Sequence, residues 1–217
     1  SRPADGTDAV HFIIDTVRSN KGLWLVPTGP LTNIALALRT APDLVDKIAG
    51  ISIMGGGRFG NRTATAEFNI WCDPEAAATV FDSGAKIIMS GLHLTHQIMA
   101  TPKRIEMVRS AHETVGPMLA GLLEFFSKMY KSLHDDFAGA PLHDVCAVLA
   151  LTHPELFTAS EKHVAVEIDG TLTRGMTVID DRHVLSRTKV NTRVLETIDA
   201  DAAFAIIVDA IRACPQR

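Results

Sequence analysis

The sequence lacks any apolar run of the roughly 18 to 20 residues that a membrane-spanning helix needs. It also lacks an excess of positive charge, because 21 Lys and Arg residues stand against 25 Asp and Glu residues and the net charge is -4. The basic residues are scattered, whereas a surface that binds nucleic acid clusters them to neutralise phosphates. We therefore expect neither a membrane nor a nucleic acid as a partner.

Cysteine is scarce. The chain has three, Cys72, Cys146 and Cys214, which lie far apart in otherwise apolar segments. An odd number of distant cysteines does not suit a disulfide framework, so reduced thiols and a cytoplasmic location are expected. No repeat, low-complexity tract or linker divides the 217 residues, 47% of which are hydrophobic, and residues 1–217 are predicted to form a single domain.

Short apolar strands that alternate with amphipathic helices dominate the sequence. Strands are expected at residues 23–26, 51–54 and 86–89, and helices at 10–17, from 31 onward, at 73–84, 144–152 and 201–213. Residues 163–168 and 171–179 are typical of two strands joined by a tight turn at Asp169-Gly170. The alternation predicts an α/β fold with a mostly parallel, Rossmann-like sheet flanked by helices and a late antiparallel hairpin.

The longest helix is predicted at residues 115–133, where apolar residues recur at helical spacing. Met118, Phe125, Phe126 and Met129 fit this periodicity. We therefore interpret them as core residues, since the spacing explains them without a cofactor.

Ligands of open α/β sheets bind beyond the carboxyl ends of the strands, so the segments that follow the predicted strands are the first places to seek chemistry. In one of them, two prolines and a glycine around Thr28 fix a tight turn whose carbonyl groups could bind a hard cation, although ordinary turns look the same. In another, Asn61, Glu67 and Asn69 could hold vicinal sugar hydroxyls, or could belong to a solvated polar loop.

The pair His143-Asp144 precedes a predicted helix. Imidazole suits a general acid near neutral pH and a carboxylate suits calcium. Asp144 could equally cap the helix while His143 packs beside it.

Two other patterns are weaker. Residues 55–60 match the G-x-G-x-x-G pattern of dinucleotide sites, but no helix is expected to begin there, so a pyrophosphate would lack its helix N-terminus. His93 and His96 lie three residues apart, yet a zinc site needs three or four ligands, and ordinary polar positions are the favoured interpretation.

Five stretches, in this order and spacing, resemble the inosine-uridine-preferring nucleoside hydrolase family. They are VPTGPLTNIALALR (26–39), MGG with GN and AEFNIWCDPEAA (54–77), GLHLTHQ (91–97), GAPLHDVCAV (139–148) and RGMTVID (174–180). The resemblance implies the nucleoside hydrolase fold and hydrolysis of ribonucleosides to ribose and free base, as in purine and pyrimidine salvage. It further implies an oxocarbenium-like transition state and a calcium ion that holds the attacking water.

The resemblance also assigns roles to individual residues. Calcium ligands are matched by the carbonyl of Thr28 and by Asp144, which is expected to contact substrate as well. The ribose pocket is matched by Met54, Asn61, Glu67, Phe68 and Asn69. The group that protonates the departing base is matched by His143.

Departures from the family pattern limit these expectations. The family's D-x-D-x-G-x-D-D run, which supplies most calcium ligands and the general base, occurs nowhere in the sequence. We therefore expect an incomplete domain that lacks N-terminal strands and is inactive alone, or alternatively a catalytically silent nucleoside-binding module. His93 replaces the usual Asp, and residues 134–137 lack a tyrosine common near the base, so base preference stays open. The resemblance also implies a homo-oligomer.

Overall fold

The computed structural model describes residues 6, 8–133, 138–182 and 189–215. Residues 134–137, where the tyrosine is missing, lie outside this part of the chain. None of the described helices is both long and apolar enough to cross a membrane. All three cysteines are unpaired, so the absence of a disulfide framework agrees with the prediction from the sequence.

The central sheet has five strands in the order β1-β2-β3-β9-β6. Their bounds are Trp24–Leu25 (β1), Gly50–Met54 (β2), Ile87–Ser90 (β3), Phe157–Lys162 (β6) and Thr192–Ile198 (β9). The first four strands in this order pair in parallel, and β6 is antiparallel to β9. The predicted mostly parallel sheet is confirmed, although neither β6 nor β9 was predicted as a strand.

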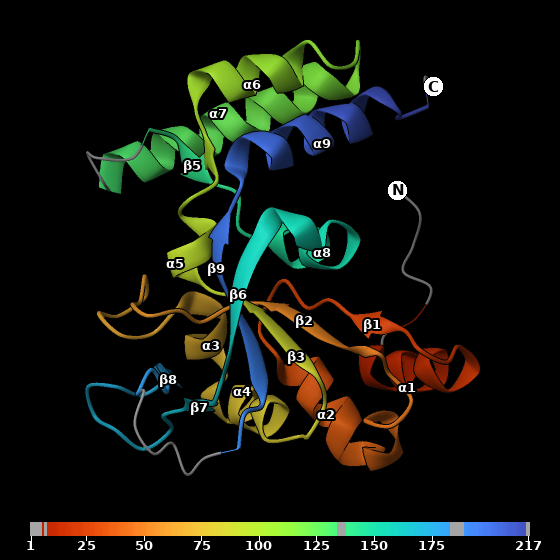
Figure 1. Cartoon of the computed structure of the whole chain (residues 1–217). Helices are drawn as coiled ribbons and strands as arrows, with labels where there is room; N and C mark the ends of the chain where they lie inside the picture. Colours follow the sequence, from red (N-terminus) through yellow and green to blue (C-terminus); the bar gives the residue numbers. More distant parts are fainter. Residues whose placement is uncertain (1–5, 7, 134–137, 183–188, 216–217) are drawn as a thin grey trace.

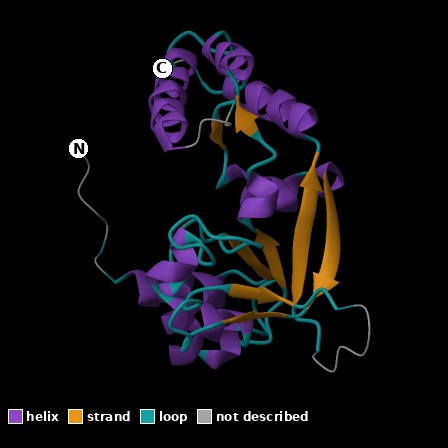
Figure 2. Ribbon diagram, turned by 90° about the vertical axis from the view of Figure 1, so that its left-hand side faces the viewer, coloured by secondary structure: helices purple, strands orange, loops and turns teal. Residues whose placement is uncertain are grey.

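Helices cover both faces of this sheet (Figures 1 and 2). In β3, Ile87 and Met89 join one buried apolar cluster and Ile88 joins the other, because successive side chains of a strand point to opposite faces. The first cluster includes residues of α1 (Ala9–Ser19), α2 (Thr32–Thr40) and α4 (Pro74–Phe81). The second includes residues of α6 (Pro102–Arg109), α7 (Val115–Leu133), α8 (Val145–Thr152) and α9 (Ala200–Arg212).

Shorter elements connect these layers. They are the 3-10 helices Pro42–Leu44 and Pro154–Leu156, the helices α3 (Phe68–Cys72) and α5 (Leu92–Thr95), and the strands β4 (Met99–Ala100), β5 (Ala140–Pro141), β7 (Val164–Val166) and β8 (Thr177–Ile179). β4 pairs with β5 and β7 with β8, both antiparallel. In Figure 1, α6, α7 and α9 lie together above α8.

The late hairpin exists, but its predicted turn at Asp169-Gly170 was wrong. β7 ends at Val166 and β8 begins only at Thr177. Glu167 ends the strand early, because its carboxylate accepts hydrogen bonds from the backbone amides of Asp169 and Gly170, which folds the chain into a longer turn. The hairpin forms a separate two-stranded sheet.

The helix predicted at residues 115–133 is confirmed, but the placement of its Met and Phe residues in the core was wrong. Met118 is 60% exposed and Phe125 is 73% exposed. The buried positions of α7 are instead small residues, Gly116, Ala120 and Ser127. At Ser127 the small side chain lets β5 pack closely, and the backbone amide of Ala140 donates to the Ser127 hydroxyl.

Candidate active site

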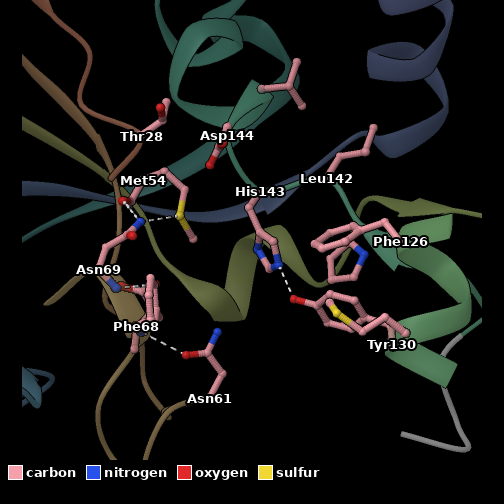
Figure 3. A pocket seen from close by; sticks show the side chains of 14 residues that line it. Thr28, Met54, Asn61, Phe68, Asn69, Phe126, Tyr130, Leu142, His143 and Asp144 are labelled. Atoms are coloured by element: carbon pink, nitrogen blue, oxygen red, sulfur yellow. Dashed lines mark hydrogen bonds between the residues drawn. The ribbon is translucent and has the colours of Figure 1, made fainter. Parts of the chain in front are cut away.

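A cavity of about 640 Å³ opens beyond the carboxyl ends of β1 and β2 (Figure 3). Small-molecule sites in proteins usually measure roughly 300–1,000 Å³, so a nucleoside-sized ligand fits. The cavity, called the pocket below, is lined by Thr28, Met54, Asn61, Glu67, Phe68, Asn69, Phe126, Met129, Tyr130, Pro141, Leu142, His143, Asp144 and Val145. All eight residues that the sequence singled out as site residues therefore lie around one pocket, while their individual roles stay predictions.

The loop that follows β2 is shaped by Glu67. Its side chain is buried and caps α3, accepting hydrogen bonds from the amides of Asn69 and Ile70, and it also binds the amide of Gly56. Burial raises the pKa of Glu67, and the charge of Asp144 raises it further, while the hydrogen bonds from these amides lower it. The solvated-loop interpretation is wrong for this residue, whose first role is to hold the loop in shape.

Two asparagines flank the same side of the pocket. The side-chain amide of buried Asn69 donates to the carbonyl of Met54 at 3.0 Å, which turns its oxygen away from β2. Exposed Asn61 accepts the amide of Phe68 through its side-chain oxygen, which leaves its amide nitrogen on the side away from that bond. The pocket is thus offered an acceptor from Asn69 and a donor from Asn61, the pair that vicinal hydroxyls require.

Asp144 occupies the N-cap position of α8, yet its side chain makes no capping hydrogen bond. The interpretation of Asp144 as a mere helix cap is therefore wrong. Asp144 and Thr28 both line the pocket, and both are drawn at its upper end in Figure 3. Although Asp144 is exposed as a residue, partial burial of its carboxyl raises its pKa. No hydrogen bond of the described residues ends on the Thr28 carbonyl, so two oxygen donors remain at this end.

His143 lies in the middle of the pocket between two hydroxyl groups. Its Nδ1 is 2.8 Å from Thr95 Oγ1 of α5, and its Nε2 is 2.8 Å from Tyr130 Oη of α7. Burial, reinforced by the neighbouring His96, lowers the pKa of His143 to about 4. Burial therefore favours the neutral form of the imidazole at physiological pH.

The sequence analysis missed Tyr130 and Thr95. Tyr130 lies within the helix predicted at residues 115–133 and Thr95 within the stretch GLHLTHQ, but neither was given a role in the site. The i, i+4 spacing of Phe126 and Tyr130, which places both on one side of α7 and in the pocket wall, was the available signal.

His93 and His96 do not converge on a common ligand. The Nε2 of His93 is 3.0 Å from the carbonyl oxygen of Leu195, and the ring of His96 lies between Phe59 and His143. Across the part of the chain that the structure describes, no three or more His, Cys, Asp or Glu side chains are grouped so that they could hold a metal. The G-x-G-x-x-G stretch likewise leads into a loop, because the next helix, α3, begins only at Phe68.

Comparison with known proteins agrees with this geometry. The model of the family described as inosine-uridine preferring nucleoside hydrolase matches residues 1–205. The chain belongs to this family. It is 40% identical over 210 residues to an inosine-uridine preferring nucleoside hydrolase of Leishmania major, covering 95% of this chain and 66% of that protein. It is 41% identical over 212 residues to a pyrimidine-specific ribonucleoside hydrolase of Salmonella schwarzengrund, covering 97% and 68%.

Solved structures place this nucleoside hydrolase chain in the same fold. A purine-preferring ribonucleoside hydrolase from Gardnerella vaginalis superposes with a TM-score of 0.88 at 35% identity, covering 98% of this chain and 69% of that one. A plant nucleoside hydrolase gives a TM-score of 0.89 at 29% identity, covering 99% and 70%. The chain thus spans about two thirds of the length of the curated relatives it matches.

Proposed function

We propose that the protein hydrolyses the N-glycosidic bond of ribonucleosides and releases ribose and a free base. One observation carries this proposal: three kinds of polar group line one pocket of about 640 Å³. They are the carboxylate of Asp144, which caps no helix, the side-chain amides of Asn61 and Asn69, and the hydrogen-bonded pair of His143 and Tyr130. Cleavage of a glycosidic bond develops positive charge on the sugar and negative charge on the leaving base. The pocket offers negative charge for the first and a proton for the second.

The ribose is proposed to lie between Asn61, Asn69 and Asp144. The asparagines offer a donor and an acceptor to its vicinal hydroxyls, and Met54 and Phe68 supply the apolar walls. The carboxylate of Asp144 favours the ribosyl cation electrostatically. Glu67 keeps its carboxylate bonded to three backbone amides and acts by fixing the loop that carries Asn69.

The leaving base is proposed to face Tyr130 and His143. Because the pKa of His143 is about 4, the imidazole is neutral and cannot serve as a cationic acid at physiological pH. His143 is therefore proposed to act through Tyr130: the Tyr130 O–H bond breaks toward the base nitrogen, the N–H of His143 Nε2 stabilises the phenolate, and the phenolate later takes up the proton that the attacking water loses. Phe126 and Met129 complete the base side of the pocket.

Calcium is the metal we propose, with the Thr28 carbonyl and Asp144 among its ligands. These oxygens fit a hard cation in kind but not in number, since calcium takes roughly six to eight oxygens and the described residues form no larger acidic group. The polypeptide is therefore proposed to bind calcium weakly and to be inactive alone. Calcium, when bound, would favour ionisation of a water molecule.

Base preference is left open in this proposal. The relatives are named inosine-uridine preferring, pyrimidine-specific and purine-preferring, so their names do not agree on one base. Ribonucleosides as a class, handled in a salvage role in the cytoplasm, are the substrates we propose.

A catalytically silent ribose-binding module is the alternative function. It is favoured by the small number of oxygen atoms that the described residues offer to a calcium ion. Calorimetric titration with inosine, uridine and an iminoribitol distinguishes the two. The protonated ring nitrogen of an iminoribitol mimics the ribosyl cation, so a hydrolase site should bind it roughly tenfold or more tightly than a nucleoside.

For a hydrolase site we expect iminoribitol to bind more tightly than the nucleosides, and Asn69→Ala to abolish this binding. Chromatography measures the release of base, which we expect only at high calcium concentration, if at all. Equal affinity for iminoribitol and nucleosides would support the silent module. If none of the three compounds binds, both functions are rejected.

A further inference from the structure

The ring of His143 is held from both sides by hydroxyl groups of different accessibility. Thr95 is fully buried at 0% exposure, whereas Tyr130 is half-buried and lines the pocket. Each ring nitrogen of a histidine donates a hydrogen bond when it carries a proton and accepts one when it does not. Which of them donates decides where the proton of Tyr130 points.

Thr95 has one place for its hydroxyl proton. Among the described residues, His143 Nδ1 is the one hydrogen-bond partner of Thr95 Oγ1, at 2.8 Å. If Nδ1 carried the proton, the hydroxyl would accept it and leave its own proton buried without an acceptor, which costs roughly 1–3 kcal/mol. The favoured arrangement therefore has Thr95 donating to Nδ1.

The position of Thr95 is fixed independently of the substrate. Its helix, α5, is tied to the β2 loop by the bond from the Leu92 amide to the Gly56 carbonyl at 2.9 Å. The following Gln97 side chain donates to the carbonyl of Glu196 in β9 at 2.8 Å. These contacts with the β2 loop and with β9 therefore hold the Thr95 hydroxyl beside His143.

We propose that Thr95 is a positioning residue that fixes His143 in the form protonated on Nε2. His143 then donates from Nε2 to Tyr130 Oη, and the hydroxyl proton of Tyr130 is directed away from the imidazole. The assignment of the tautomer does not depend on the proposed function. Its consequence rests on that function: in a nucleoside hydrolase, Tyr130 presents its proton to the leaving base.

NMR of the imidazole nitrogens in isotope-labelled protein at neutral pH tests the assignment, with His143→Gln to identify the signal. The expected spectrum shows a protonated Nε2 and an unprotonated Nδ1 in the wild type, in Thr95→Ser and in Tyr130→Phe. Thr95→Val, which keeps the shape but removes the donor, should move the proton to Nδ1. A wild type protonated on Nδ1 overturns the proposal, even if Thr95→Val fails to fold. So does a folded Thr95→Val with an unchanged spectrum, or a tautomer change in Tyr130→Phe.

Kinetics provide the second readout. In protein that hydrolyses nucleosides, Thr95→Val should lower kcat by ~10²-fold with KM unchanged, and Thr95→Ser should restore it. A loss confined to KM rejects the positioning role. If no preparation binds or hydrolyses nucleosides, the proposed function fails, while the tautomer is still decided by the NMR spectra.

Discussion

Asp144 and Asp73 stand at the same position of two helices but use their side chains differently. Asp73 caps α4 by accepting the amide of Ala76 at 3.0 Å, whereas Asp144 caps nothing. Asp73→Ala should therefore lower the free energy of unfolding by about 1 kcal/mol, and Asp144→Ala should change it by less than about 0.5 kcal/mol. Urea unfolding of both variants measures this, and equal losses would contradict the assignment of Asp144 to the pocket.

The same Asp144→Ala variant is expected to lose calcium affinity, because it removes one of the two oxygen donors at its end of the pocket. Calcium titration followed by calorimetry measures the change, with Asp73→Ala as the control that keeps the pocket carboxylate. Unchanged calcium binding in Asp144→Ala would remove this residue from the metal site.

His143 and Tyr130 should matter most for substrates whose leaving group needs a proton. His143→Ala and Tyr130→Phe are expected to slow hydrolysis of inosine and uridine by ~10²-fold, while nitrophenyl riboside, which leaves as a stable anion, is spared. Steady-state rates on both classes of substrate provide the measurement. Equal losses on both classes would reject the leaving-group role.

The residues of the pocket could be named from the sequence only where a matching motif contained them. His143 and Asp144 lie in one stretch, and Asn61, Glu67 and Asn69 in another. Tyr130 lies in no such stretch, and its place depends on the rotation of α7 against β5, which the close packing at Ser127 and Ala140 fixes. Such a rotation is a tertiary property that helical periodicity does not encode.

At the scale of the element, Gly56 is where the loop after β2 can pass close to β8. Its φ is 70°, and a Cβ there would lie 2.6 Å from Thr177 Cγ2. Gly56→Ala should therefore lower the free energy of unfolding by about 2 kcal/mol or more, from backbone strain and overlap together. Urea unfolding gives the loss.

Gly121 provides the matched control for Gly56. It lies in the exposed middle of α7, and a Cβ there would have no neighbour within 4 Å. Gly121→Ala should stabilise the protein by roughly 0.5–1 kcal/mol, since alanine is the better helix former. A similar effect of both substitutions would show that the close approach at Gly56 has no energetic weight.

The helix α7 illustrates what sequence pattern can and cannot predict for an element. Its limits agree with the periodicity, because hydrophobic spacing and the absence of breakers determine where a helix can run. The prediction of which residues are buried was wrong because apolar residues occupy two adjacent sides of the helix. Val115, Leu119 and Leu123 pack on the core, while Met118 and Leu122 are exposed. Periodicity alone does not distinguish the two sides.

For the whole molecule, the parallel part of the sheet was predictable because β2 and β3 are short, mostly apolar runs buried on both faces. β6 and β9 were not predictable, because their sequences FTASEK and TRVLETI mix polar and apolar residues. Their strand structure depends on pairing with each other along residues 157–162 and 192–198. A single domain over residues 1–217 stays a prediction.

The stability of the whole molecule should depend on pH through His93, which lies where α5 meets β9. Its Nε2 is bonded to the Leu195 carbonyl, and its buried Nδ1 has no hydrogen-bond partner among the described residues. Burial first, and then the charge of Arg58, lower the pKa of His93, although Glu196 and Asp181 oppose this. A proton on Nδ1 would place a charged donor where the described structure offers no acceptor.

Because the folded pKa of His93 is below the unfolded value of 6.5, the neutral ring stabilises the fold above that pH. This stability is lost as pH falls from 6.5 toward the folded pKa, since the unfolded chain takes up the proton first. His93→Gln keeps a donor for the Leu195 carbonyl and cannot titrate. Urea unfolding across this pH range should show the wild type losing more stability than His93→Gln on acidification, and parallel curves would mean that the buried imidazole does not set the acid limit of the fold.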